Sequence, residues 1–316
     1  MEAAWGGMAA EGSRIAGQCL FGSGVPVCRD PDEAWVPRKS RGQLGVDITP
    51  RRGRMNSDYV VEMRGISKRF GGVHALKKVD LEVRRGEIMG IVGDNGAGKS
   101  TLMKVLSGAY LADEGQVFIN GQEVHIDNPQ QAFRLGIGMI YQDLALFNNL
   151  DVAGNIFIGR ESMYGPLKLL LDMKSMYAKA EALTKELRIS ISSPRLKVAR
   201  MSGGQRQMVA CARAIAFQSQ VLIMDEPTAA LGVTEANALL GLVRNLKAMG
   251  LSILLITQRI PDVLAIADRV FVLKGGERQG VLDVSKVTLD DVVTMIVKGR
   301  EDNGKAPPEV KFKSFG

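Results

Sequence analysis

The chain has 316 residues, of which 46% are hydrophobic and 24% are charged, the composition of a soluble globular protein with ample chain for one large or two ordinary domains. Its formal net charge of +7 raises nucleic acid and anionic membranes as candidate partners. Lys and Arg are scattered, however, without a block of about five or six like charges, so we expect a solvated surface and no nucleic-acid partner. No run approaches about eighteen consecutive apolar residues, so we expect no membrane-spanning segment.

The cysteines and histidines are too few and too dispersed for a disulfide framework or a metal centre. The three cysteines are Cys19, Cys28 and Cys211, and the third falls within a helical pattern, so a reducing cytosol fits best. The two histidines, His74 and His125, are expected to be surface or turn residues.

The two ends of the chain lack the periodic patterns of packed helices and strands. Residues 1–54 are rich in Gly and turn formers, and we expect a disordered extension. Alternatively, translation starts at Met55, because a strand-like pattern begins at residues 59–63; in either case residues 1–54 are expected to be dispensable. Their acidic residues argue against a transit peptide, and the lack of an apolar segment argues against a secretion signal. Residues 300–316 are polar and are expected to form a flexible tail.

From residue 58 to about residue 142 the pattern predicts short strands around a glycine-rich loop. The expected strands are residues 59–63, 79–83, 87–92, 116–119 and 137–141. Phe70 lies in the turn-rich stretch 68–72, where its ring could stack on a nucleotide base. A phenylalanine that packs in the core or against the turn is equally compatible with the pattern.

The glycine-rich loop fits the phosphate-binding pattern G-x-x-x-x-G-K-[ST], and it lies between an apolar strand and a helical run at residues 101–106. Its residues are Gly93, Asp94, Asn95, Gly96, Ala97, Gly98, Lys99, Ser100 and Thr101. Glycines allow positive φ and bring backbone N–H groups to phosphate oxygens, and the helix start adds free donors. Lys99 is expected to reach the β and γ phosphates of ATP, and Ser100 to bind Mg²⁺. A chance match on an ordinary Gly-rich turn is the alternative.

Residues 143–216 change character and predict a mostly helical insert, with helical runs at residues 152–159 and 174–187. The insert ends in a strongly helix-forming run that is preceded by Ser202, Gly203, Gly204 and Gln205. A serine before two glycines predicts a helix N-terminus with an open backbone, which binds anions readily. Taken alone, a plain N-cap explains this pattern better.

An apolar strand at residues 221–224 then delivers two adjacent carboxylates, Asp225 and Glu226, at its carboxyl end. Such an end is where a Mg²⁺ site requires negative charge, so Asp225 is expected to hold the ion, directly or through water. Glu226, which points the other way along the strand, is expected to polarise an attacking water. Adjacent carboxylates in a loop are usually surface charges, but the run before these two is too apolar for that.

Together, and in this order, the motifs resemble the nucleotide-binding subunit of an ATP-binding-cassette (ABC) transporter over roughly residues 58–299. Residues 93–101 are similar to the Walker A loop, residues 202–205 to the signature motif, and residues 221–226 to the Walker B strand with its catalytic glutamate. The resemblance covers most of the chain, and it implies that ATP and Mg²⁺ are the cofactors.

The resemblance also assigns roles to isolated residues. Gln142 is similar to the Q-loop glutamine, which touches the metal and the catalytic centre, and Phe70 is similar to the aromatic residue that stacks on adenine. Two positions depart from the family pattern. Gly232 stands where many cassettes have aspartate, which weakens a polar link across the dimer, and Gln258 stands where the family has its catalytic switch histidine. Because of Gln258 we expect slow but real hydrolysis; the alternative is that another residue compensates for Gln258.

The finer resemblance is to carbohydrate importers, in residues 143–150, 155–161 and 226–231. Many of these carry two cassettes in one chain, whereas this chain has one, similar to the monosaccharide type, as in fructose uptake. The resemblance implies a homodimer in which the signature helix of one chain faces the phosphate loop of the other. It also implies transmembrane permease subunits that dock at the helical insert, an extracytoplasmic sugar-binding protein, and a peripheral location on the cytoplasmic face of the membrane.

The fold expected is α/β: a P-loop NTPase with a RecA-like core of mainly parallel strands, helices on both faces, an antiparallel β subdomain, and an inserted α-helical subdomain at about residues 143–216. The leading function is ATP hydrolysis that powers import of a monosaccharide. A soluble cassette ATPase of repair or translation is one alternative. The other is a hydrolysis-impaired module that serves assembly or regulation, and Gln258 is its only support.

Overall fold

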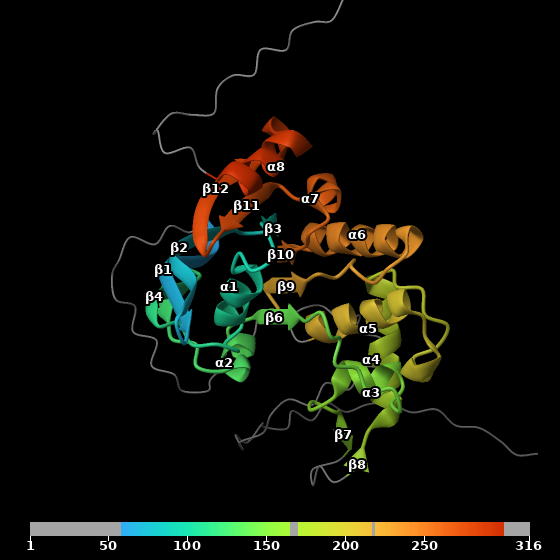
Figure 1. The fold of residues 1–316 in the computed structure, drawn as a ribbon. Helices are drawn as coiled ribbons and strands as arrows, with labels where there is room; N and C mark the ends of the chain where they lie inside the picture. Colours follow the sequence, from blue (N-terminus) through green and yellow to red (C-terminus); the bar gives the residue numbers. More distant parts are fainter. Residues whose placement is uncertain (1–57, 165–169, 217–218, 300–316) are drawn as a thin grey trace, which may run out of the picture. The chain divides into compact units, whose positions relative to one another are not determined.

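The computed structural model describes residues 58–164, 170–216 and 219–299, whose helices and strands are shown in Figure 1. The predictions made for residues 1–54 and 300–316 lie outside these ranges. Within them the chain is mixed α/β, with one four-stranded, one six-stranded and one two-stranded sheet. The predicted α/β class is therefore confirmed.

The antiparallel sheet is built from the first strands of the described chain, in the order β2-β1-β4-β5. Their bounds are β1 (Tyr59–Phe70), β2 (Val73–Arg84), β4 (Glu114–Ile119) and β5 (Gln122–Val124). The pairing of β1 with β2 continues until Phe70 lies opposite Val73, so both strands are longer than predicted. The prediction that placed Phe70 within a turn is wrong: cross-strand pairing extends β1 to Phe70, and Gly71 and Gly72 make the turn.

The six-stranded sheet forms the centre of the fold, with strand order β12-β11-β3-β10-β9-β6. The bounds are β3 (Ile88–Val92), β6 (Ile137–Ile140), β9 (Val221–Asp225), β10 (Ser252–Ile256), β11 (Arg269–Lys274) and β12 (Glu277–Asp283). All neighbouring pairs are parallel except β11 with β12. Because parallel strands end at one edge of a sheet, the segments that follow β3, β9 and β10 emerge side by side.

Both faces of this sheet are buried, as expected for continuously apolar parallel strands. In β10, Ile253 and Leu255 belong to one hydrophobic cluster, whereas Leu254 and Ile256 belong to the other. The second cluster joins α1 (Lys99–Leu106) to the antiparallel sheet, and Figure 1 shows α1 between the two sheets. The other described helices are α2 (Pro129–Arg134), α3 (Val152–Phe157), α4 (Met173–Glu186), α5 (Gly203–Ile215), α6 (Val233–Ala248), α7 (Ile260–Ile266) and α8 (Leu289–Lys298), with 3₁₀ turns η1 (Val198–Arg200) and η2 (Val284–Lys286).

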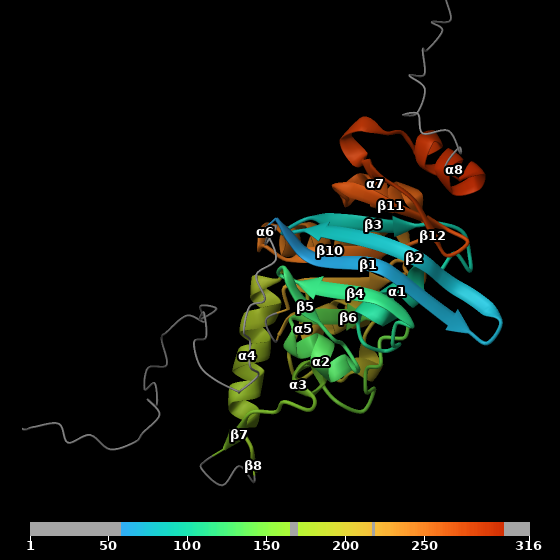
Figure 2. The same cartoon turned by 90° about the vertical axis from the view of Figure 1, so that its left-hand side faces the viewer.

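Helices dominate the segment between β6 and β9, where helical runs were predicted. α3 packs against both α4 and α5, and Ile156, Ala180 and Cys211, one from each helix, share the first hydrophobic cluster. A small antiparallel pair, β7 (Met163–Tyr164) and β8 (Leu170–Leu171), extends beyond α4 in Figure 2. The sequence did not predict this pair, because strands of two residues are too short to show an alternating pattern.

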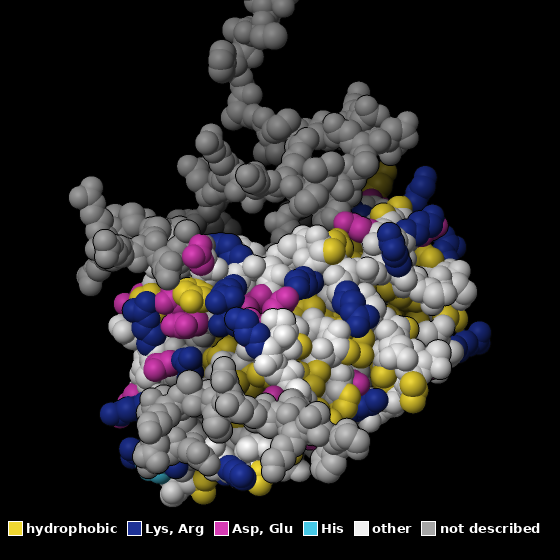
Figure 3. All heavy atoms as spheres, turned by 90° about the horizontal axis from the view of Figure 1, so that it is seen from above, with side chains coloured by type: hydrophobic (Ala, Val, Ile, Leu, Met, Phe, Trp, Pro, Cys, Tyr) yellow, Lys and Arg dark blue, Asp and Glu magenta, His cyan; other side chains and the backbone are white. Residues whose placement is uncertain are grey.

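The surface carries mixed charge. On the face drawn in Figure 3, Lys and Arg side chains are interspersed with acidic and apolar ones. No described helix is long and apolar enough to cross a membrane.

The histidines and the described cysteine lie in different surroundings. His74 and His125 are exposed, as predicted. Cys211 is fully buried, and burial raises the pKa of its thiol to about 12. Cys211 is therefore a packing residue rather than a reactive thiol.

A buried ion pair ties the start of β11 to the residue that precedes β3. The Arg269 guanidinium donates to both carboxylate oxygens of Glu87, from Nε at 2.9 Å and from Nη2 at 2.6 Å. The backbone N–H of Arg84 also donates to Glu87, at 2.5 Å. The side chains of Arg269 and Glu87 are only 12% and 6% exposed. Burial opposes the charge on Arg269, but the hydrogen bonds from Glu87 prevail and raise the pKa of Arg269.

We predict that Arg269→Met lowers the free energy of unfolding by about 3 to 5 kcal/mol, because it leaves a buried carboxylate without its partner. Adding Glu87→Gln should restore much of that loss, since no charge is then buried. As a control, Lys185→Ala removes an ion pair whose side chains are 76% and 54% exposed, and it should cost about 1 kcal/mol or less. Urea denaturation measures all three; equal losses for Arg269→Met and Lys185→Ala would contradict the prediction.

Candidate functional site

The predicted phosphate loop lies between β3 and α1, at the carboxyl edge of the six-stranded sheet. Gly93 and Gly98 have φ of 150° and 101°, in the region that favours glycine. A Cβ at Gly93 would lie 2.0 Å from the carbonyl oxygen of Leu273, and one at Gly98 would lie 2.5 Å from that of Ala75. The backbone therefore approaches its neighbours too closely for any residue but glycine at both positions.

Lys99, the first residue of α1, points back over this loop. Its ammonium donates to the carbonyl oxygens of Gly93 at 2.7 Å and of Asp94 at 2.9 Å. Burial lowers the pKa of Lys99, and the nearby carboxylates of Glu226 and Asp225 counteract that shift. The loop thus encloses a cation beside two acidic groups that lie far from it in the sequence.

Ser100 and Asp225 bring two oxygen ligands together. The Ser100 hydroxyl donates to Oδ1 of Asp225 at 3.2 Å, and Asp225 is the last residue of β9 and only 7% exposed. Burial raises the pKa of Asp225, while the hydrogen bond from Ser100 and the charges of Lys104 and Lys99 lower it. A hydroxyl and a carboxylate suit Mg²⁺, which takes few protein ligands and completes its octahedron with water and phosphate oxygens.

Glu226 follows Asp225 in an unusual backbone conformation. Its φ is 50°, which is rare for a residue with a side chain and occurs most often where the surrounding structure enforces it. Its N–H donates to the carbonyl oxygen of Ile256 at 2.9 Å, which ties the end of β9 to the end of β10. Burial raises the pKa of Glu226, although a hydrogen bond from the N–H of Gln258 at 3.3 Å favours the ionised form. A carboxyl group of raised pKa is suited to accept a proton.

Gln258 links the phosphate loop to Glu226. It lies just after β10, the strand between β3 and β9, so it emerges between the loop and the two carboxylates. Its Nε2 donates to Oδ1 of Asn95 at 2.7 Å while its N–H donates to Glu226. The sequence placed Gln258 here only by resemblance, and this polar bridge to Asn95 was not predicted.

Gln142 is less closely tied to the group. It follows β6, whose Ile140 lies opposite Met224 of β9, so Gln142 leaves the sheet at the same edge as Asp225. Its side chain is exposed. Gln142 therefore lies at the same edge of the sheet as Asp225, and its role at the metal stays a prediction.

Phe70 lies at the tip of the antiparallel sheet, beside an aromatic residue that the sequence did not single out. Its ring is 5.1 Å from that of Tyr110, at an interplanar angle of 69°, and Phe70 is 43% exposed. Lys68 and Lys104 approach the two rings, at 5.6 Å and 5.4 Å from their centroids. Phe70 is thus a surface aromatic residue in a cationic setting rather than a core residue.

The predicted signature motif starts α5, and Ser202 is its N-cap as expected. Ser202 Oγ accepts from the N–H of Gln205 at 3.2 Å, and Gln205 Oε1 accepts from the N–H of Ser202 at 3.1 Å, which forms a capping box. Among residues 58–164, 170–216 and 219–299, no hydrogen bond or ion pair joins Ser202–Gln205 to the phosphate loop or to Glu226. Within one chain, the site residues therefore form two separate groups.

Comparisons with known proteins identify one family and its relatives. Residues 76–229 match the family described as ABC transporter. The chain is 41% identical over 251 residues to the xylose/arabinose import ATP-binding protein XylG of Sulfolobus acidocaldarius, covering 78% of this chain and 98% of that protein. It is 40% identical over 252 residues to the fructose import ATP-binding protein FrcA of Rhizobium meliloti, covering 78% and 97%. Other relatives are longer: the chain spans 48% of a putative ribose/galactose/methyl galactoside import ATP-binding protein of Burkholderia ambifaria, at 40% identity.

Solved structures agree with the fold. A nucleotide-free ATP-binding cassette from an ABC transporter superposes with a TM-score of 0.66 at 28% identity, covering 75% of this chain and 95% of the other. A dimeric cassette in a post-hydrolysis state, bound to ADP and phosphate, superposes with a TM-score of 0.60 at 25% identity, covering 71% and 98%. The predicted P-loop NTPase fold is therefore confirmed, and the chain belongs to the ABC transporter family.

Proposed function

We propose that this chain is the ATP-binding and ATP-hydrolysing subunit of an ABC importer, and that hydrolysis drives uptake of a monosaccharide through a partner permease. The observation that carries the proposal is the meeting of Lys99, the Ser100–Asp225 pair and Glu226 at one edge of the sheet. Relatives named for import of xylose, arabinose and fructose favour a monosaccharide. Residues 58–299 form the cassette, with residues 143–216 as its helical subdomain.

Each residue of the cluster has a distinct task. The N–H groups of residues 93–101 and the Lys99 ammonium bind the phosphates of ATP. Ser100 and Asp225, with Gln142, would hold Mg²⁺, which would supply positive charge to offset that of the phosphates. Glu226 orients and deprotonates the attacking water.

Phe70 serves the other end of the nucleotide. Its exposed ring stacks on adenine, and Tyr110 supports it from the side. This assignment rests on the family resemblance and on the exposure of the ring.

The active assembly is a dimer of cassettes. The signature residues Ser202, Gly203, Gly204 and Gln205 form a helix N-terminus that lies apart from the phosphate loop of its own chain, so in the dimer each N-terminus faces the nucleotide of the second copy. Permease subunits dock near Gln142 and the helical segment, an extracytoplasmic binding protein supplies the sugar, and the cassettes lie on the cytoplasmic face of the membrane. A hydrolysis-impaired regulatory cassette is the second candidate, and Gln258 at the histidine position favours it.

The first test concerns the general base. Glu226→Gln keeps the shape of the side chain but cannot take a proton, so we expect hydrolysis to fall by about 10²- to 10⁴-fold while ATP binding persists. Steady-state phosphate release and ATP titration measure the two properties. Near-normal turnover would remove Glu226 from the mechanism.

The second test concerns nucleotide affinity. Lys99→Ala removes a charge directed at the phosphates in every state of the cycle, so we expect ATP affinity itself to fall. Titration calorimetry measures the affinity, and Lys174→Ala, on α4, serves as a control that removes one positive charge elsewhere. Equal affinities for the wild type and Lys99→Ala would count against the proposed phosphate site.

The third test concerns Gln258. Glutamine donates one hydrogen bond where a histidine would donate and also become cationic, so the transition state is less stabilised. We expect slow but real hydrolysis, and a rise of about tenfold, near 1.4 kcal/mol of barrier, in Gln258→His. The steady-state ATPase rates of the assembled transporter with wild-type chain and with Gln258→His measure this rise. No rise, with wild-type turnover already at about 1 to 10 per second, would refute the impaired-site interpretation.

A further inference from the structure

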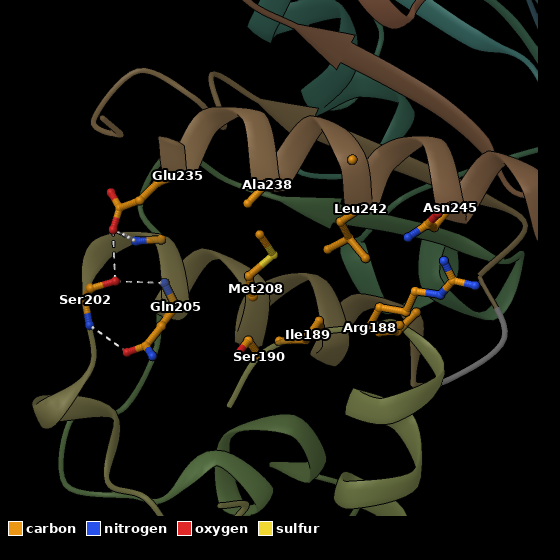
Figure 4. A pocket seen from close by; sticks show the side chains of 13 residues that line it. Arg188, Ile189, Ser190, Ser202, Gln205, Met208, Glu235, Ala238, Leu242 and Asn245 are labelled. Atoms are coloured by element: carbon orange, nitrogen blue, oxygen red, sulfur yellow. Dashed lines mark hydrogen bonds between the residues drawn. The ribbon is translucent and has the colours of Figure 1, made fainter. Parts of the chain in front are cut away.

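The N-terminus of α5 is already in contact with an anion of its own chain. Glu235, in the first turn of α6, accepts a hydrogen bond from Ser202 Oγ at 3.0 Å and one from the N–H of Gly204 at 3.4 Å. Figure 4 shows its carboxylate above the start of α5, pointing at these donors. A serine hydroxyl has one hydrogen, so Ser202 cannot donate to a second acceptor while it donates to Glu235.

The helices approach closely enough to hold this contact. A Cβ at Gly204 would lie 3.0 Å from Cβ, Cγ and Cδ of Glu235, so the glycine gives the acidic side chain room to lie against α5. Glu235 and Ser202 also line one end of a cavity of about 460 Å³ between α5 and α6, which continues past Met208 and Leu242. Open volume therefore lies beside the Glu235 carboxylate, next to its contacts with Ser202 and Gly204.

We propose that Glu235 is a competing anion, which must leave Ser202 and Gly204 before a phosphate of the partner's nucleotide can bind there. The proposal rests on the proposed function, in which the α5 N-terminus faces ATP held by a second copy of this chain. A carboxylate and a phosphate cannot share the same donors, and their like charges repel. Glu235 thus opposes closure of the ATP-bound dimer and keeps the signature residues occupied in the separated chains.

Two substitutions separate competition from positioning. Glu235→Gln keeps the length of the side chain and an oxygen that accepts from Ser202 and Gly204, but it removes the charge. Glu235→Ala removes both the charge and the contact. If Glu235 only holds α5 against α6, Glu235→Gln forms the ATP-bound dimer as readily as the unsubstituted chain, and Glu235→Ala forms it less readily. If Glu235 competes with phosphate, both variants close more readily.

The experiment measures ATP-driven dimerisation of the full chain in the Glu226→Gln background, by sedimentation with Mg²⁺ and ATP. We expect Glu235→Gln to lower the dimer Kd about tenfold, equivalent to about 1.4 kcal/mol, and to leave ATP affinity of the separated chain unchanged. Glu186→Gln, which removes an exposed carboxylate from α4, is the matched control and should leave the dimer Kd unchanged.

The outcomes separate this inference from the proposed function. An unchanged or raised dimer Kd in Glu235→Gln overturns the competing role, and weaker closure in Glu235→Ala assigns Glu235 to positioning instead. Failure of the Glu226→Gln parent to dimerise with ATP, at a concentration where it binds ATP, overturns the proposed dimer and this inference with it. A dimer that forms normally while Glu235→Gln has no effect leaves the proposed function standing.

Discussion

The site depends on the register of three adjacent parallel strands, β3, β10 and β9. Ile91 lies opposite Ile256, and Ile256 lies opposite Asp225, so the three chains leave the sheet at one level. The phosphate loop, Gln258 and Glu226 follow directly, and their mutual hydrogen bonds are a consequence of that register. A shift of one residue in β10 would turn Gln258 away and move each apolar side chain of β10 into the cluster on the opposite face, so packing on both faces of the sheet fixes the residues at its edge.

Local motifs were predictable because each one carries its own geometry. The phosphate loop, the capped start of α5 and the apolar strand before Asp225 are encoded in consecutive residues, and the structure has them where the sequence indicated. Strand ends were less predictable: Phe70 was assigned to a turn because Gly71 and Gly72 follow it, whereas pairing with Val73 decides its conformation. The strands β7 and β8 have only two residues each, which is too short for an alternating pattern in the sequence.

Contacts between distant residues could not be read from the sequence. Tyr110 beside Phe70, Asn95 bonded to Gln258, and Glu235 bonded to Ser202 each join segments that meet only after folding. Nothing in the composition or periodicity of α6 distinguishes Glu235 from an ordinary acidic residue in the first turn of a helix, where negative charge is favourable. The contact of Glu235 with α5 follows from tertiary packing. Gly204 is the residue in the sequence that permits this close approach, because it has no side chain.

The two acidic residues that follow the apolar part of β9 are kept distinct by backbone conformation. Asp225 ends the strand in regular pairing, and its carboxylate meets Ser100, whereas the positive φ of Glu226 directs the chain toward the end of β10. Strain at Glu226 costs free energy of about 1 to 3 kcal/mol, and the hydrogen bond to Ile256 and the surrounding sheet must offset it. Burial raises the pKa values of both carboxyl groups, so a nearby positive charge is needed to favour their ionised forms. The charge of Lys99 acts in this way on both. The buried lysine therefore stabilises the ionised pair, so its removal should disturb the acidic residues even where no nucleotide is bound.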